Sequence, residues 1–213
     1  KFNVKNDLII YLGDYIDRGK NSKEVINQIL KIKKKEIKTV NLMGNHDEFM
    51  IDFLFNKKNN IQNWLNFGLD QTLRSYGIEV VDFIKDGFGD DIIDQLRNTL
   101  LSTMSEEHIN FFKDLELSFS SEKYLFVHAG IDPKKTLEDQ TKEDFLWSRS
   151  KSFFDKDFKA QKIIVHGHTP EENIINNSHR INIDTGCYFS GKLSSVCLSD
   201  HNDSRLFINN LLK

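Results

Sequence analysis

Short apolar runs that end in glycine and polar residues recur along this chain. Four such runs lie at residues 7–12, 39–43, 124–128 and 163–166. An apolar run of this length, bounded by glycine, predicts a buried strand. Because ligands bind at the carboxyl ends of strands in open α/β sheets, we expect a functional site among the polar residues that follow these runs.

A helix is predicted between the first two strands. Ser22 is its candidate N-cap, and apolar residues recur along one face as far as about Lys35. A strand, a helix and a second strand in this order predict a crossover between adjacent parallel strands.

The segment from residue 48 to residue 116 lacks the alternation of a strand. It predicts helices at 49–55, 61–76, 92–104 and 106–115, separated by asparagine and glycine. We interpret the segment as a helical insertion. Its aromatic residues are expected to lie in the core; they are Trp64, Phe67, Phe111 and Phe112.

The second half of the chain predicts a sheet. Residues 117–120 and 124–128 read as a hairpin, and residues 141–147 as a short helix. Further strands are predicted at 163–166, 180–184, 193–198 and 206–209. No repeat or low-complexity linker divides the sequence, so a single domain spanning 1–213 is expected.

Composition narrows the functional classes. The formal charge is −3, with acidic and basic residues intermixed, so no nucleic-acid partner is expected. No uninterrupted apolar run is long enough to cross a bilayer, so no membrane partner is expected either. Cys187 and Cys197 are predicted to be buried thiols rather than a disulfide, and we expect a cytoplasmic protein.

The loop after the first strand has the residues of a metal and phosphate site. Asp14 and Asp17 offer hard oxygen ligands to a divalent cation. Arg18 offers a planar fork of donors that suits two phosphate oxygens. The alternative is an exposed acidic turn with Arg18 in a surface ion pair.

The other strand ends carry matching chemistry. Asn45 can give an amide oxygen to a metal, and His46 beside Asp47 has the composition of a proton donor oriented by a carboxylate. His128 and His168 follow the two later strands, where an imidazole can bind a metal.

Four motifs carry a resemblance to a known family. They are GDYIDRG at 13–19, GNHDE at 44–48, VHAG at 127–130 and HGHTP at 166–170. In this order they resemble the calcineurin-like metallophosphoesterases. The stretches 145–149, 182–186 and 191–193 resemble the bacterial and phage serine/threonine phosphoprotein phosphatases within that family, as does Pro170 in place of a further histidine.

This resemblance implies an α/β fold, a four-layer sandwich of two mixed β-sheets flanked by helices, with the helical insertion at 48–116. It implies two divalent metal ions, with Mn²⁺ expected first and iron or zinc as alternatives. Their ligands in this chain would be Asp14, Asn45, His128 and His168.

The resemblance also implies a mechanism. A hydroxide that bridges the metals would attack phosphorus directly, without a phosphoenzyme. His46, held by Asp47, would protonate the leaving alkoxide. Arg18 and Arg149 would clamp the phosphate oxygens.

The family resemblance also implies a preceding strand with an Asp-x-His-Gly motif, which would bind the first metal. Residues 1–12 contain no histidine, so we expect the sequence to be incomplete at its N-terminus.

Three functions therefore stay open. The first is a phosphatase of phosphoserine and phosphothreonine in proteins or peptides. The second is a hydrolase of diadenosine polyphosphates, and the third is a binding fragment with impaired catalysis.

Further polar residues are expected to support the site or to lie at the surface. Asp17 is expected to support Arg18 or a metal-bound water, and His166 to support the site without binding metal. Asp184 is expected to orient a histidine or to cap the turn at Gly186, and Tyr188 is a weak candidate for the pocket rim. Surface positions are predicted for three histidines: His108, His179 and His201.

Overall fold

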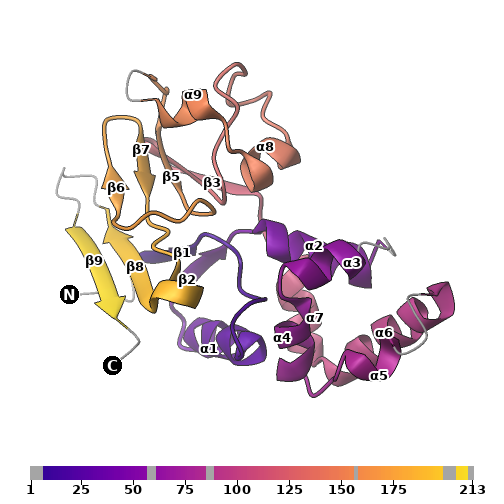
Figure 1. Cartoon of the computed structure of the whole chain (residues 1–213). Helices are drawn as coiled ribbons and strands as arrows, with labels where there is room; N and C mark the ends of the chain where they lie inside the picture. The colour runs from indigo at the N-terminus through magenta and orange to yellow at the C-terminus, as the bar shows by residue number, and fades with distance from the viewer. Residues whose placement is uncertain (1–6, 57–60, 85–88, 156–157, 199–204, 211–213) are drawn as a thin grey trace. The chain divides into compact units, whose positions relative to one another are not determined.

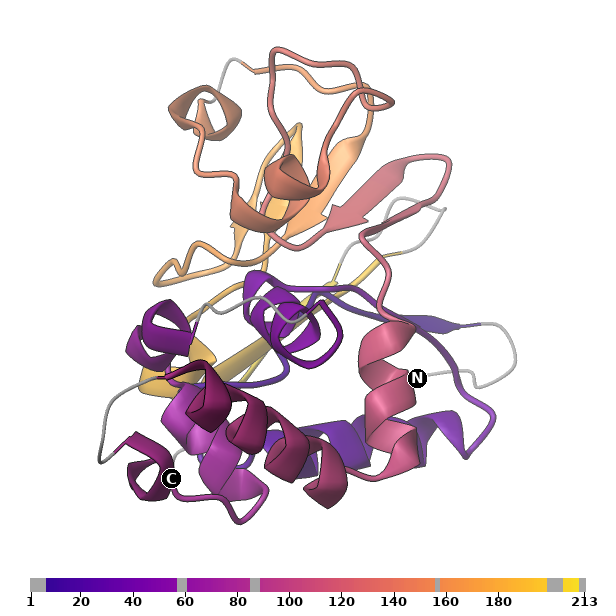
Figure 2. The ribbon, with the colours of Figure 1, turned by 90° about the vertical axis from the view of Figure 1, so that its right-hand side faces the viewer.

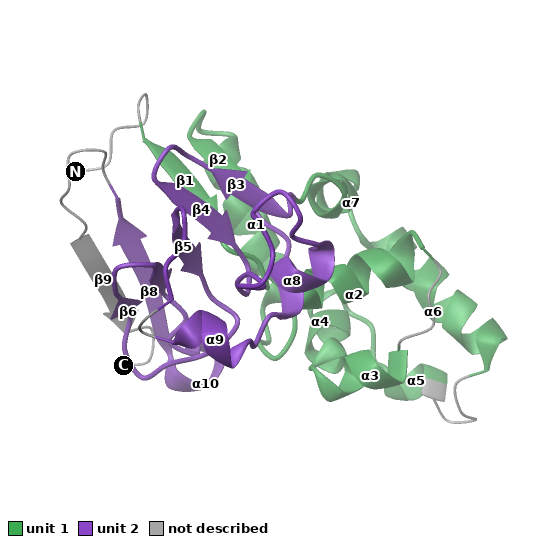
Figure 3. Cartoon of the chain, turned by 90° about the horizontal axis from the view of Figure 1, so that it is seen from above, with its two compact units in different colours: residues 1–41, 45–115 green, residues 42–44, 116–213 purple. Residues whose placement is uncertain are grey.

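The computed structural model describes residues 7–56, 61–84, 89–155, 158–198 and 205–210. Contacts between residues divide the chain into two compact units (Figure 3). Unit 1 comprises residues 1–41 and 45–115, and unit 2 comprises residues 42–44 and 116–213.

Unit 1 begins with the predicted crossover. Strand β1 (Leu8–Tyr11) pairs in parallel with β2 (Lys38–Asn41), and helix α1 (Ser22–Lys33) connects them (Figure 1). The N-cap is Asn21 rather than the predicted Ser22. Ser22 instead lies in the first turn and is buried, with its hydroxyl 3.3 Å from the carbonyl oxygen of Gly19.

The rest of unit 1 is mainly helical in its described residues (Figure 2). The helices are α2 (Asn45–Leu54), α3 (Ile61–Asn66), α4 (Leu69–Ser75), α5 (Val81–Ile84), α6 (Asp90–Thr103) and α7 (Glu106–Lys113). Helices α4 and α7 contact α1, helices α3, α6 and α7 contact α2, and α5 packs on α6. The predicted helix at 61–76 is interrupted at Gly68, whose φ of 102° is incompatible with a continuous α-helix.

The predicted aromatic core of unit 1 is largely confirmed. Trp64, Phe111 and Phe112 are all buried. Phe67 is only half-buried, and its ring lies at 85° to that of His46, with the ring centroids 5.8 Å apart.

Unit 2 is built on a mixed five-stranded sheet in the order β3-β4-β5-β7-β6. The strands are β3 (Ser118–Ser120), β4 (Tyr124–Val127), β5 (Ile163–His166), β6 (Ile175–Asn176) and β7 (Arg180–Asn182). The predicted hairpin β3–β4 is antiparallel, whereas β4, β5 and β7 run parallel. Strands β8 (Lys192–Cys197) and β9 (Arg205–Asn210) form a separate antiparallel pair.

The described residues of unit 2 also form three short helices: α8 (Lys142–Trp147), α9 (Lys151–Phe154) and α10 (Cys187–Ser190). Phe145 of α8 and Phe153 of α9 pack with Val127 and Ile164 of the sheet in one hydrophobic cluster. The predicted α/β class, with mixed sheets flanked by helices, is confirmed.

Some sequence predictions were wrong. His108 and His179 are buried rather than exposed, each with 2% of its surface accessible, while His201 lies outside the described residues. The two cysteines are free, but Cys197 is exposed because it lies on the outward face of β8. Of the helices in the part of the chain that the structure describes, none has the length and apolar character needed to cross a bilayer.

Candidate functional site

The loop after β1 has an unusual backbone. Gly13 has a φ of 94°, but Asp14, Asp17 and Arg18 also have positive φ angles, of 58°, 72° and 57°. Such conformations are costly for residues with a side chain and persist only where the surroundings hold them. They cluster at functional sites in proteins, so this loop is the first place to look for chemistry.

Asp47 is one of the groups that hold this loop. Its carboxylate accepts hydrogen bonds from the backbone N–H of Asp14 at 2.8 Å and of Tyr15 at 3.1 Å. The backbone N–H of His46 in turn donates to the Asp14 carboxylate at 3.2 Å. The first turn of α2 and the loop after β1 are therefore tied together, and Asp47 is fully buried between them.

The carboxylate that binds His46 is Asp17 and not the predicted Asp47. His46 Nδ1 lies 2.6 Å from Asp17 Oδ2, and both side chains are buried. The prediction relied on adjacency in sequence, but side chains at i and i+1 of a helix point in different directions. An ionised Asp17 can only accept, so Nδ1 carries the proton in this bond and Nε2 is left for other chemistry.

His46 and Asp17 each affect the pKa of the other. Burial lowers the pKa of His46, but the hydrogen bond to Asp17 and the negative charges of Asp14 and Asp17 outweigh it, so the net pKa is raised. Burial raises the pKa of Asp17, and the hydrogen bonds from His46, Thr72 and Trp64 oppose that rise.

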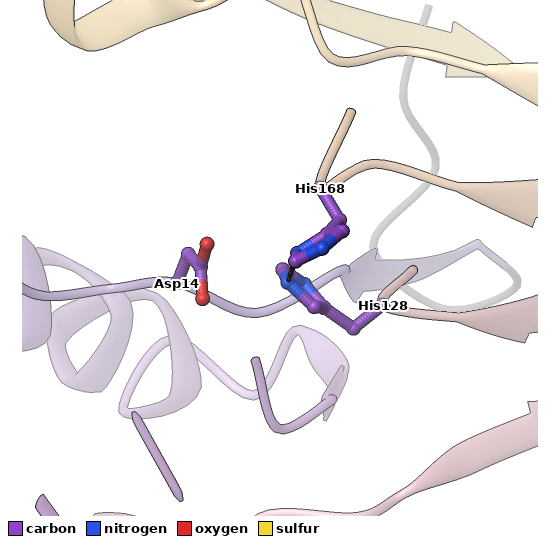
Figure 4. A group of neighbouring side chains, drawn as sticks. All are labelled: Asp14, His128 and His168. Atoms are coloured by element: carbon purple, nitrogen blue, oxygen red, sulfur yellow. Dashed lines mark hydrogen bonds between the residues drawn. The ribbon is translucent and has the colours of Figure 1, made fainter. Parts of the chain in front are cut away.

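In unit 2, two histidines meet at the edge of the sheet. His128 follows β4 and His168 follows β5, and these strands are parallel neighbours. The backbone N–H of Gly167 donates to the carbonyl oxygen of His128 at 2.8 Å, which aligns the two strand ends. His128 Nε2 lies 3.1 Å from His168 Nδ1, with the rings at 74°. Figure 4 shows the two rings side by side, joined by a dashed line.

The two imidazoles fit a common cation. With metal–nitrogen bonds of about 2.1 Å and angles between about 90° and 109°, two ligand nitrogens are separated by about 3.0–3.4 Å. The observed 3.1 Å lies in that range. His168 also has a positive φ of 66°, so its backbone is held in the conformation that turns its ring toward His128.

Unit 1 offers oxygen donors of the predicted kind. Asn45 begins α2 and is buried. Asp14 lies in the loop after β1 and is labelled in Figure 4 together with the two histidines. A mixture of imidazole, amide and carboxylate ligands suits manganese, iron or zinc better than calcium.

The two candidate phosphate-binding arginines are exposed. Arg18 lies on the strained loop of unit 1. Arg149 comes two residues after Trp147, whose ring centroid lies 6.1 Å from that of His168. Their role in binding phosphate stays a prediction.

The supporting residues of unit 2 have defined contacts. His166 is fully buried, with Nδ1 3.0 Å from the carbonyl oxygen of Gly167, and burial lowers its pKa to about 3. Asp184 caps the turn at Gly186, since its carboxylate accepts the Gly186 N–H at 2.8 Å. Tyr188 is 57% exposed.

Sequence reasoning missed Thr72 and the polar role of Trp64. Both donate hydrogen bonds to the Asp17 carboxylate, from Thr72 Oγ1 at 2.6 Å and from Trp64 Nε1 at 2.7 Å. The only signal in the sequence is that Trp64, Gly68 and Thr72 recur at intervals of four residues, which would place them on one face of the predicted helix at 61–76.

Comparison with known proteins identifies relatives over most of the chain. The bis(5'-nucleosyl)-tetraphosphatase PrpE [asymmetrical] of Oceanobacillus iheyensis is 24% identical over 206 residues, covering 89% of this chain and 73% of the relative. The protein of the same name from Anoxybacillus flavithermus is 25% identical over 205 residues, covering 88% and 74%.

A solved structure supports the fold. The metallophosphoesterase from Sphaerobacter thermophilus matches with a TM-score of 0.51 and 12% sequence identity, covering 96% of this chain and 77% of that one. The family model described as calcineurin-like phosphoesterase matches residues 1–202. The chain therefore belongs to the calcineurin-like phosphoesterase family, a class of metal-dependent enzymes that hydrolyse phosphate esters.

Proposed function

We propose that this chain hydrolyses the phosphoanhydride bonds of dinucleoside polyphosphates, with a dinucleoside tetraphosphate as the representative substrate. The observation that carries the proposal is the set of relatives that cover 88–89% of the chain, all of which bear the name bis(5'-nucleosyl)-tetraphosphatase. Their names favour this substrate over the phosphoprotein that the motifs first indicated.

In this proposal the metal ligands are those that the family resemblance implies: Asp14, Asn45, His128 and His168. The bound divalent ions would polarise phosphoryl oxygens and lower the pKa of water. The close approach of the two imidazole nitrogens in unit 2 supports this ligand set, because their separation of 3.1 Å suits a shared cation.

The remaining residues would act on the substrate itself. Asp17 holds the Nδ1 side of His46, which leaves Nε2 to donate a proton to the departing oxygen. Arg18 and Arg149 would bind non-bridging phosphate oxygens, for which guanidinium groups are well suited. A polyphosphate chain carries several negative charges and so can engage both arginines.

Protein phosphatase activity is the second candidate, and the stretch 145–149 is the observation that favours it. The two substrates make different demands on His46. A serine leaves as a strongly basic alkoxide and needs a proton donor, whereas a nucleotide leaves as a weakly basic phosphate. Replacing His46 should therefore slow the first reaction much more than the second.

The direct test compares diadenosine tetraphosphate with a phosphoserine peptide in the presence of Mn²⁺. We expect kcat/KM to be at least about 10-fold higher for diadenosine tetraphosphate, with AMP and ATP as the separated products. A higher value for the phosphopeptide would overturn the proposed substrate. Turnover of neither substrate would favour the impaired binding fragment. Asp14→Asn is the control and should abolish both activities.

A further inference from the structure

Three residues of the helical segment in unit 1 reach the same loop. Trp64 in α3, Gly68 between the helices and Thr72 in α4 are spaced four residues apart. Trp64 and Thr72 contact Asp17, and Gly68 lies against Arg18. The segment 64–72 therefore contacts both Asp17 and Arg18, the two neighbouring polar residues of the loop after β1.

The contacts on Asp17 fix its carboxylate at both oxygens. Oδ1 accepts from the Thr72 hydroxyl at 2.6 Å, and Oδ2 accepts from Trp64 Nε1 at 2.7 Å as well as from His46 Nδ1 at 2.6 Å. The backbone N–H of Asp17 donates to the same Thr72 oxygen at 2.8 Å. Trp64 and Thr72 are almost completely buried, so water does not compete for these bonds.

Gly68 allows the segment to approach the backbone of Arg18. A Cβ at Gly68 would lie 2.5 Å from Arg18 N and 3.0 Å from Arg18 Cα, too close for any side chain. Arg18 has a positive φ of 57°, a conformation that its surroundings must hold. The packed backbone of Gly68 is one of those surroundings.

We infer that the segment 64–72 positions the loop after β1, which carries Asp17 and Arg18. Trp64 and Thr72 hold Asp17 and, through it, the imidazole of His46. Gly68 holds the backbone of Arg18, from which the guanidinium reaches phosphate. This inference rests on the proposed function of His46 and Arg18, and it gives the helical segment two separable effects, on protonation of the leaving group and on phosphate binding.

The first effect is tested with Thr72→Val, which keeps the side-chain shape and removes the hydroxyl that both donates to and accepts from Asp17, and with Trp64→Phe, which removes the indole donor and leaves a smaller aromatic ring. The substrates are 4-nitrophenyl phosphate, whose leaving group needs little protonation, and phenyl phosphate, whose leaving group is more basic. We expect kcat for phenyl phosphate to fall about 10- to 100-fold, and kcat for 4-nitrophenyl phosphate to change less than about 3-fold.

The matched control is Tyr76→Phe. It removes a buried hydroxyl at the C-terminal end of α4, just beyond the segment, but that hydroxyl bonds His108 Nδ1 at 2.7 Å and not Asp17. Both substrates should be turned over as by the unchanged chain. An equal loss on both substrates in the Thr72 and Trp64 variants, or no loss on either, would show that these residues have only a structural role.

The second effect is tested with Gly68→Ala, using inorganic phosphate as a competitive inhibitor. We expect its inhibition constant to rise about 10-fold, because loss of one charge-assisted contact typically has this size. Gly77→Ala is the control, since Gly77 also has a positive φ, of 82°, but has nothing within 4 Å of an added Cβ. An unchanged inhibition constant in Gly68→Ala would refute this part of the inference.

A readout without turnover separates this inference from the proposed function. His46 Nδ1 lies 2.6 Å from Asp17 Oδ2. The proton in this short hydrogen bond should give a sharp downfield resonance in the proton NMR spectrum of the metal-free chain. It should broaden or shift in Thr72→Val and Trp64→Phe and persist in Tyr76→Phe. If the resonance is unchanged in all three variants, the inference fails even if the enzyme is active. If it responds as expected in a chain that hydrolyses neither substrate, only the proposed function fails.

Discussion

Gly130, two residues after His128, gives the sharpest stability prediction. Its φ is 155°, and an added Cβ would lie 2.7 Å from Cε1 and 3.0 Å from Cδ1 of Phe153. Phe153 is completely buried in the core of unit 2, so its ring has little room to move. Gly130→Ala should therefore combine backbone strain with overpacking.

The two costs can be estimated separately. Backbone strain contributes about 1–3 kcal/mol, and overpacking against a buried ring contributes about 1–3 kcal/mol. We therefore expect Gly130→Ala to lower the free energy of unfolding by about 2–6 kcal/mol. Gly77→Ala should cost only about 1–2 kcal/mol, because it introduces strain without a clash.

The assay is urea unfolding followed by circular dichroism, with Phe153→Leu completing a double-mutant cycle. The smaller leucine should relieve the clash, so the double variant should be more stable than the sum of the single effects by about 1–3 kcal/mol. A Gly130→Ala variant that costs no more than Gly77→Ala, or a cycle that is simply additive, would refute the reasoning.

Three further predictions follow from the metal site, a buried histidine and the cysteines. Mn²⁺ at about 100 times its Kd should raise the free energy of unfolding by about 2.7 kcal/mol and Tm by several degrees. In a thermal melt, His168→Ala should lose most of this rise. If the variant keeps the full rise, His168 is not a ligand. Burial, and then the charge of Lys23, lower the pKa of His108 from 6.5, so the folded chain binds this proton less readily than the unfolded chain. The stabilising contribution of neutral His108 is present above pH 6.5 and declines as the pH falls below that value. His108→Gln should flatten this pH dependence of the free energy of unfolding, measured with urea. Iodoacetamide should modify the exposed Cys197 faster than Cys187, because burial and the charge of Asp184 raise the pKa of the Cys187 thiol; equal rates by mass spectrometry would contradict this.

Much of the local structure could be predicted because it follows from local patterns. The parallel pair β1–β2 with its helix, the hairpin β3–β4 and strand β5 all correspond to apolar runs with clear boundaries. The shortest elements, such as β6 and α10, were missed because two to four residues carry too little periodicity to be recognised.

The burial of polar residues could not be predicted in the same way. His108 is surrounded by polar residues in sequence, yet its ring nitrogens lie 2.7 Å from the Tyr76 hydroxyl and 2.9 Å from Asn27 Oδ1. Those partners are 32 and 81 residues away along the chain. A polar residue can be buried when distant groups satisfy its hydrogen bonds, and a local pattern does not contain them.

The family and the candidate ligands could be predicted from the residues alone, because the motifs that carry them stand directly after strands. Which polar groups bind one another depends on the fold. Asp47, next to His46 in sequence, binds the backbone of Asp14 and Tyr15, whereas Asp17 reaches the imidazole. The physical reason is that hydrogen bonding depends on direction as well as distance. The left-handed backbone of Asp17 and its contacts with a distant helical segment set that direction.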